Sequence, residues 1–440
     1  MIVGAGLSGL SIGFGLKRQG VGNIAIIDQR PEGREGPWIT CARMATLRSP
    51  KHLTGPDLGL PSLTFRSWYE ATSGREAWER LGKIPPDDWM NYLKWYRRSL
   101  DLPVHNETRL TEIGDDGDLL ALDLETPTGG ERVHCRRIVL ATGVDGAGRP
   151  HVPELIAAAL PRDRYSHSAD QIDPGAFGGR DIVVIGAAAS AFDWAVAALD
   201  NGARTATLLA RRPALPKTEA LAWANFPGFL GGFVELDDLR RWRFMRRFFA
   251  LQQPPTQEMF DRATNNPRFR LVLNAPLTGA GIEGGRVFVE TEQGPFRCDH
   301  VLLGTGYEID LAQRPELAGF ADHIALWRDR FAPPLGEEDS ALAGYPYLGP
   351  TFELSERETG RAPWLRRIHI FNNGAILSLG PVCNGVTGLK YGAPKIAAGL
   401  ARSLFLEDAD RHLDALMDYE EAHFNAVPPR ERRNDRCSPF

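Results

Sequence analysis

The first 28 residues, MIVGAGLSGLSIGFGLKRQGVGNIAIID (Met1–Asp28), decide the fold. Gly4, Gly6 and Gly9 form a G-x-G-x-x-G turn between a short apolar strand and an apolar-periodic helix pattern. A second apolar strand then ends in Asp28, where an acid would hold a ribose hydroxyl. Turn, helix, strand and acid together predict a βαβ unit that binds a dinucleotide. We expect Ser8 and Gln29 to lie beside the same ligand.

The same plan returns in RDIVVIGAAASAFDWAVAALDNGARTATLLARR, residues 180–212. Gly186, Ala188 and Ala191 take the three glycine positions, and Ser190 lies in the same turn. The middle position normally lets the backbone approach a pyrophosphate, and here it carries one extra methyl group. This unit has no acid after its second strand. It has the two cations Arg211 and Arg212 instead, and arginine there accommodates a 2′-phosphate.

The contrast between the two units assigns the ligands: FAD in the first unit and NADPH in the second. Each unit is followed by a hairpin-like segment and an apolar strand that ends in Thr-Gly, at Thr142–Gly143 and at Thr305–Gly306. The predicted fold class is therefore α/β, with two Rossmann-like dinucleotide-binding domains and helical insertions.

The expected domain boundaries follow from this repeat. Residues 1–165 form the first part of the FAD-binding domain, with a Trp- and Pro-rich insertion at 36–105. Residues 166–330 form the NADPH-binding domain, with a mostly helical insertion at 213–265, and residues 331–440 return to the FAD domain and supply a C-terminal helix.

Composition excludes several classes of protein. The 440 residues carry a formal net charge of −5, which leaves no general basic surface for nucleic acid. The five cysteines are scattered without a C-x-x-C pair, so neither a zinc site nor a redox dithiol is supported, and a reducing cytoplasm is the expected location. No signal peptide and no apolar run long enough for stable membrane insertion is found.

Several further segments resemble one enzyme family. They are Gly36–Trp38 (GPW), residues 85–102 (PPDDWMNYLKWYRRSLDL) and residues 165–171 (YSHSADQ). With the two turns and the two Thr-Gly strand ends, they are similar to the class B flavin-dependent monooxygenases, which include flavin-containing, N-hydroxylating and Baeyer–Villiger enzymes.

The resemblance implies an FAD-dependent enzyme that uses NADPH and O2 to oxygenate a nitrogen or sulfur of a small organic substrate through a flavin hydroperoxide. Such chemistry needs no metal. Trp38 of the GPW segment is expected at the cofactor. Arg48, Ser49 and Lys51 are candidates for lining the flavin and nicotinamide, and Asn384 and Thr387 precede a helix whose N–H groups would face the flavin.

Alternatives stay open at this stage. The Baeyer–Villiger fingerprint F-x-G-x-x-x-H-x-x-x-W is not met around His167, where Pro161, Asp163 and Gln171 stand in place of Phe, Gly and Trp. A ketone monooxygenase is therefore a second hypothesis. A non-oxygenating FAD/NAD(P)H oxidoreductase is a third. A non-catalytic or single-cofactor flavoprotein, whose second unit is only a scaffold, would follow if Ala188 blocks NADPH. The identity of the substrate and a homo-oligomeric state are also open.

Overall fold

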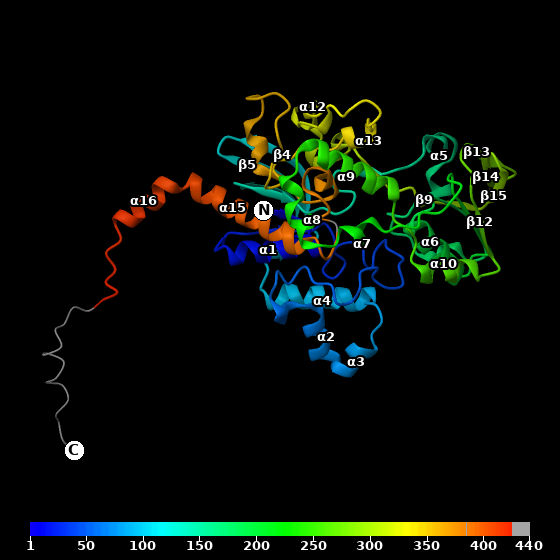
Figure 1. Cartoon of the computed structure of the whole chain (residues 1–440), viewed down its shortest axis with the longest axis horizontal. Helices are drawn as coiled ribbons and strands as arrows, with labels where there is room; N and C mark the ends of the chain where they lie inside the picture. The colour runs from blue at the N-terminus through cyan, green and yellow to red at the C-terminus, as the bar shows by residue number, and fades with distance from the viewer. Residues whose placement is uncertain (384, 425–440) are drawn as a thin grey trace, which may run out of the picture.

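The computed structural model describes residues 1–383 and 385–424 (Figure 1). A five-stranded parallel sheet forms the first unit, in the order β18-β7-β1-β2-β3. These strands are β18 (Ile368–Ile370), β7 (Ile138–Leu140), β1 (Ile2–Val3), β2 (Ile26–Ile27) and β3 (Val104–His105). Helix α1 (Leu7–Arg18) packs against α15 (Leu389–Glu407) beside this sheet. Segments near residue 1 and near residue 400 therefore pack together in one unit.

A second parallel sheet repeats the plan, in the order β12-β11-β10-β16-β9. Its strands are β12 (Phe269–Val272), β11 (Thr205–Leu209), β10 (Asp181–Ile185), β16 (His300–Leu303) and β9 (Tyr165–His167). The central strands β10 and β16 are continuous apolar runs because both of their faces are covered, as in other parallel sheets. Helix α6 (Ala189–Asp200) and α10 (Gln257–Thr264) pack together beside this sheet. The predicted α/β class with two Rossmann-like units is confirmed.

Each unit also carries a three-stranded antiparallel sheet, as the hairpin-like segments predict. The first holds β4 (Arg109–Asp116), β5 (Leu119–Thr126) and β6 (Gly129–Cys135). The second holds β13 (Leu277–Glu283), β14 (Arg286–Thr291) and β15 (Gly294–Cys298). A two-stranded ladder of β8 (Gly148–Pro150) and β17 (Tyr307–Ile309) joins the ends of the two units.

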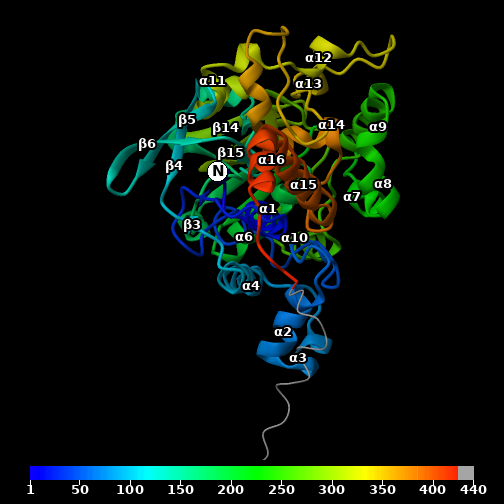
Figure 2. The same ribbon diagram turned by 90° about the vertical axis from the view of Figure 1, so that its left-hand side faces the viewer.

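The insertion at 36–105 contains α2 (Phe65–Ser73), α3 (Arg75–Arg80) and α4 (Pro86–Ser99). Aromatic rings hold these helices together: Phe65 lies within 6.3 Å of the rings of Trp78, Trp89 and Tyr92. Trp78 and Trp89 are buried, so these tryptophans pack the insertion. Figure 2 shows α2 and α3 at the far end of the molecule, away from both sheets.

The insertion at 213–265 is helical, as predicted. It holds α7 (Ala220–Ala224), α8 (Pro227–Gly232), α9 (Asp238–Leu251) and α10. On α9 the apolar side chains Trp242 and Met245, three residues apart, face inward: both are fully buried, and the Trp242 ring packs against Trp327. Within the described part of the chain, no helix combines the length and apolar character needed to cross a bilayer.

The remaining helices are short, apart from α16, which follows α15 at the end of the described chain. The α-helices are α5 (Glu154–Ala159), α11 (Pro315–Ala318), α12 (Trp327–Arg330), α13 (Ser340–Ala343), α14 (Ile376–Leu379) and α16 (Ala409–Met417). The 3-10 helices are Pro61–Leu63, Arg162–Arg164, Pro174–Phe177, Phe233–Glu235, Leu311–Gln313, Ala321–His323, Pro363–Arg367 and Asn373–Ala375.

Candidate functional site

The first glycine turn is shaped by contacts that only glycine allows. Gly4 has a φ of 100°, and a Cβ there would lie 2.5 Å from the carbonyl oxygen of Ala141. A Cβ on Gly9 would lie 1.8 Å from the carbonyl oxygen of Gly4. Gly6 differs, because the nearest atom to its Cβ would be the Gly36 Cα at 3.8 Å. The chain itself therefore does not require glycine at position 6, and the open space there suits an approaching ligand.

The start of α1 is prepared for an anion. Its N-cap is Gly6, no side chain caps the helix, and its first turn holds no acid. The free N–H groups and the helix dipole at such an end favour a phosphate. Asp28 lies behind the turn and is buried. Its Oδ2 accepts the N–H of Ala5 at 2.8 Å and its Oδ1 accepts the N–H of Arg30 at 2.9 Å, so the carboxylate is already held in place.

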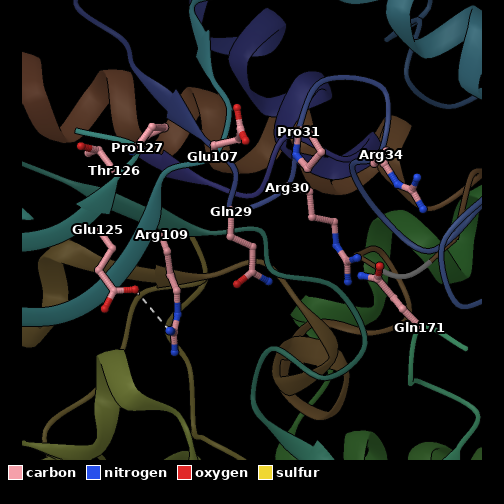
Figure 3. Close-up of a pocket in the computed structure, with 10 residues that line it drawn as sticks. All are labelled: Gln29, Arg30, Pro31, Arg34, Glu107, Arg109, Glu125, Thr126, Pro127 and Gln171. Atoms are coloured by element: carbon pink, nitrogen blue, oxygen red, sulfur yellow. Dashed lines mark hydrogen bonds and ion pairs between the residues drawn. The ribbon is translucent and has the colours of Figure 1, made fainter. Parts of the chain in front are cut away.

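A cavity of about 660 Å³ opens directly after Asp28 (Figure 3). This volume is in the range of small-molecule and cofactor pockets. Figure 3 shows Arg30 and Gln171 pointing toward each other across the cavity, while Arg109 pairs with Glu125 at 3.3 Å. The lining residues are Gln29, Arg30, Pro31, Arg34, Glu107, Arg109, Glu125, Thr126, Pro127 and Gln171. The predicted residue Gln29 is therefore at a cavity that can hold the nucleoside end of a dinucleotide.

The second turn has the same construction. Gly186 has a φ of 141°, and a Cβ there would lie 2.4 Å from the carbonyl oxygen of Gly304. A Cβ on Gly304 would lie 2.7 Å from the Cβ of Ala191. The methyl group of Ala191 is therefore the largest side chain that fits against Gly304. Ala188 is the N-cap of α6, with φ −90° and ψ 176°. Gly6 has nearly the same angles, φ −72° and ψ −172°, so Ala188 does not distort the turn.

The first turn of α6 is likewise free of acids and of a side-chain cap, and Ser190 is half-buried within it. Arg211 and Arg212 follow β11, at the edge of the sheet where this helix begins. Within the described residues, neither guanidinium has a hydrogen bond or an ion pair, and the same holds for Lys217 six residues further. Two cations without an ion-pair partner among the described residues therefore follow β11 directly, as expected from the sequence for a 2′-phosphate site.

The two Thr-Gly strand ends have different surroundings. The Thr142 hydroxyl accepts a hydrogen bond from Asn372 Nδ2 at 3.0 Å, and Gly143 has a φ of 84°. In the second unit the Thr305 hydroxyl donates to the carbonyl of His151, and Gly306 accepts the N–H of His151 at 2.9 Å. Both strand ends are thus fixed by segments that cross over from elsewhere in the chain.

Segments distant in the sequence converge at the first turn. The Ser8 hydroxyl donates to the carbonyl of Cys383 at 3.2 Å. A Cβ on Gly55 would lie 1.8 Å from the carbonyl oxygen of Val386, so the loop after Lys51 lies directly against the segment before α15. Thr387 belongs to this segment and is half-buried, while Asn384 lies outside the described residues. Helix α15 begins after Gly388 without a side-chain cap.

The candidate loop at 43–51 contacts the second unit. Arg48 forms an ion pair with Asp193 of α6, and the guanidinium of Arg43 lies 4.6 Å from the ring centroid of Trp194. Asp193 is 4% exposed, and burial raises the pKa of its carboxyl group, an effect that Arg48 partly offsets. Sequence reasoning missed Asp193, because a polar residue inside a helix gives no local sign of a partner 145 residues away.

Three other predicted residues, Lys51, Ser49 and Trp38, have surroundings of their own. The Lys51 ammonium donates to the carbonyl of Trp78 at 2.6 Å and to that of Leu81, so it ends helix α3 inside the insertion. Ser49 is half-buried beside Arg48. Trp38 is half-buried, and its ring packs edge-on against Trp89 at 5.9 Å. Among the described residues, no cluster of three or more His, Cys, Asp or Glu could hold a metal ion.

His167 is buried, and its Nε2 has no partner. Its Nδ1 accepts the N–H of Ala169 at 3.0 Å, and its ring packs edge-on against Tyr307 at 5.6 Å. Burial lowers the pKa of His167, so the ring is neutral at physiological pH. These contacts describe a packed structural histidine at the end of β9.

Comparison with known proteins places this architecture. Residues 1–222, which include both nucleotide turns, match the family described as pyridine nucleotide-disulphide oxidoreductase. FAD-dependent urate hydroxylase from Xanthomonas campestris pv. campestris is 42% identical over 424 residues, covering 96% of this chain and 89% of that protein.

Two solved structures show the same fold. Ornithine hydroxylase from Pseudomonas aeruginosa has a TM-score of 0.70 at 16% identity, covering 92% of this chain and 98% of its own. L-lysine 6-monooxygenase from Pseudomonas syringae has a TM-score of 0.67 at 17% identity, and the match covers 92% of this chain and 99% of that protein.

The family name refers to a disulphide, but this sequence contains no C-x-x-C pair. The identity to a hydroxylase extends over nearly the whole chain, well beyond the nucleotide turns. The chain therefore belongs to the pyridine nucleotide-disulphide oxidoreductase family, and its relationship to a hydroxylase over 96% of its length makes it an FAD-dependent monooxygenase within that family.

Proposed function

We propose that the chain is an NADPH- and O2-dependent hydroxylase whose substrate is urate or a closely related oxopurine. The observation that carries the substrate class is the 42% identity to a urate hydroxylase across 96% of the chain. In the overall reaction, two electrons leave NADPH, one oxygen atom of O2 enters the substrate, and the other leaves as water. FAD, when bound, relays the two electrons from the nicotinamide to oxygen.

The first turn would hold the FAD. The N–H groups at the start of α1 would bind the pyrophosphate, and Asp28, fixed by the N–H groups of Ala5 and Arg30, would accept a ribose hydroxyl. The cavity after Asp28 would take the adenosine. Ser8, tied to Cys383, keeps the turn against the segment before α15, where Thr387 lies.

The second turn would hold the NADPH. Ala188 keeps the backbone angles of Gly6, so the start of α6 still presents its N–H groups to a pyrophosphate. Arg211, Arg212 and Lys217 have no partner within the described chain, and a 2′-phosphate would neutralise them. We place the enzyme in the cytoplasm, because the scattered cysteines without a C-x-x-C pair suit a reducing compartment.

A second candidate is oxygenation of an amine nitrogen or a sulfur. The GPW segment and residues 85–102, which resemble segments of the class B flavin-dependent monooxygenases, a family that includes N-hydroxylating enzymes, support it. Ketone oxygenation is less favoured because the residues that flank His167 depart from the Baeyer–Villiger fingerprint.

One set of measurements tests the cofactors and the substrate. The purified protein should be yellow, and the released flavin should be FAD. Anaerobic NADPH should bleach it much faster than NADH. In air, urate should stimulate NADPH oxidation and O2 uptake in equal amounts, and mass spectrometry should find product with one added oxygen.

The outcomes separate the hypotheses. Coupled oxidation with ornithine, lysine or a sulfide, but not with urate, would support the second candidate and reject the first. Flavin bleaching without any coupled oxygenation across this panel would favour a non-oxygenating oxidoreductase. No bleaching by either nucleotide would reject the role of the second turn.

A further inference from the structure

Helix α16 presents an apolar stripe that the described part of the chain leaves uncovered. No residue of α16 is buried. Five large apolar side chains near the α15–α16 corner and along α16 are 56% to 76% exposed: Phe405, Leu406, Leu413, Leu416 and Met417. Those on α16 are spaced by three and four residues, so they form one face. A contiguous apolar face of this kind is typical of a protein contact.

Ion pairs anchor the residues that immediately precede α16 to the rest of the chain. Arg136 binds Glu407 at 2.8 Å and Asp408 at 2.7 Å, and Arg137 also pairs with Glu407. The ring of Phe405 stacks on His412 at 5.3 Å. Figure 1 shows α16 leading away from the body of the molecule, and within residues 1–383 and 385–424 no residue of α16 is buried.

A second exposed apolar surface lies on the insertion at 213–265. Leu221, Trp223, Phe226 and Phe244, here called the aromatic patch, are 37% to 57% exposed. Their rings are already assembled, since Trp223 stacks on Phe244 at 6.1 Å and meets Phe226 at 5.6 Å. The patch is supported from below by the buried ring of Phe229. A partner would therefore meet a rigid apolar surface.

The charges of the two surfaces are opposite. Residues 409–421 contain five acids and one arginine, whereas α9 contains five arginines and one aspartate. Arg247 is exposed on one side of Phe244, whereas Arg243 on the other side pairs with Glu337 at 2.7 Å; Asp410 and Asp414 lie on α16, and Asp418 follows its last residue. Two α16 helices would repel each other, and so would two aromatic patches. The complementary pairing joins α16 to the patch.

We propose that α16 of one copy binds the aromatic patch of a second copy, and that the exchange is reciprocal. One nine-residue helix buries too little surface for a stable complex, but a two-fold dimer forms two such contacts at once and closes without leaving a free end. In the dimer, Leu413 and Leu416 cover the aromatic rings, and the aspartates of α16 face the arginines of α9.

Sedimentation velocity of the intact flavoprotein tests this arrangement. The wild type should be a dimer at micromolar concentration, and it should dissociate more readily at high salt because the charges are screened. Leu413→Asp with Leu416→Asp should give monomers, and so should Phe244→Asp. Leu335→Asp is the matched control, since Leu335 is 98% exposed but belongs to neither surface, and it should stay dimeric. Circular dichroism and FAD content check that each variant folds.

Exchange of charges tests the pairing itself. Asp414→Arg alone should weaken the dimer at least tenfold, and adding Arg247→Glu to the same chain should restore it. A monomeric wild type overturns the proposal, as does binding of that monomer to vesicles of anionic phospholipid. A dimer that survives Phe244→Asp but not the α16 substitutions also overturns it, because α16 would then pair with itself.

Discussion

The two glycine-type turns differ at one residue whose role can be isolated. Gly6 and Ala188 have nearly the same backbone angles, and at Gly6 the chain leaves open space where a Cβ would stand. The choice between glycine and alanine at these places therefore concerns the ligand more than the fold. At Gly4 and Gly186 the reverse holds, because backbone atoms lie within 2.5 Å of an added Cβ.

Substitution at these two positions should separate the two cofactors. Gly6→Ala should leave the protein folded but lower its FAD content, because the methyl group enters the space of the pyrophosphate. Ala188→Val should raise the KM for NADPH about tenfold, a loss of about 1.4 kcal/mol in binding, with normal FAD content. Ala188→Gly should lower that KM. If Ala188→Val changes only the melting temperature, the second turn serves packing alone.

The arginine pair after β11 sets a second residue-level expectation. Arg211→Ala with Arg212→Ala should raise the KM for NADPH by about tenfold to a hundredfold, because charge-assisted bonds to a phosphate are worth roughly 1.5–3 kcal/mol. The KM for NADH should change little. Arg402→Ala, an exposed arginine on α15, is the control and should leave both values unchanged. An unaltered NADPH/NADH ratio would contradict the assignment.

At the scale of elements, the sequence predicted the parts that depend on local pattern. The strand–turn–helix segments, the hairpins and the inward-facing apolar side chains of α9 follow from periodicity and glycine spacing, and the structure confirms them. The contacts of the loop at 43–51 do not follow from such patterns. Lys51 donates to carbonyl groups at the C-terminal end of α3, and Arg48 forms an ion pair with Asp193 of α6. Tertiary packing determines both sets of partners. No local signal distinguishes these arginines and lysines from solvated ones.

The Arg48–Asp193 pair joins this loop to α6 and should matter for stability. Arg48→Ala leaves a carboxylate buried without its partner, which should lower the free energy of unfolding by about 2–5 kcal/mol at neutral pH. The double substitution Arg48→Ala with Asp193→Asn should recover most of this loss. Chemical denaturation measures both.

The pH dependence of the single variant gives a further check. Asp193 without Arg48 has a raised pKa, so the defect of Arg48→Ala should grow as pH rises above about 4 and shrink in acid. Arg66→Ala removes an exposed pair with Glu70 and should cost less than about 1 kcal/mol. If Arg48→Ala and Arg66→Ala lower the free energy of unfolding equally, the buried pair contributes no more to stability than the exposed pair.

For the whole molecule, buried histidines predict how stability changes with pH. Burial lowers the pKa of His300 and of His369 to about 4, from an ordinary value of 6.5. Both rings are neutral in the folded protein, while the unfolded chain binds protons below pH 6.5. Stability should therefore be fully present above pH 6.5 and fall progressively as pH drops toward 4.

Thermal unfolding at several pH values measures this slope. His300→Gln can keep the hydrogen bond to the Ser166 hydroxyl, 2.8 Å from Nε2 in the wild type, and should flatten the fall between pH 6.5 and 4. His105→Gln, an exposed histidine, should not. An identical slope in both variants would show that other groups govern the acid limit.

The position of β18 has a consequence for how the protein is made. The first sheet begins with residues 2–3 and is completed by residues 368–370, and its opening turn is held by the carbonyl of Cys383. The strands of the second sheet all lie between residues 165 and 303. On the ribosome, the unit that is translated later can therefore fold first. The amino-terminal strand must wait until residues 368–383 have emerged, and FAD can be enclosed only after that segment has been synthesised.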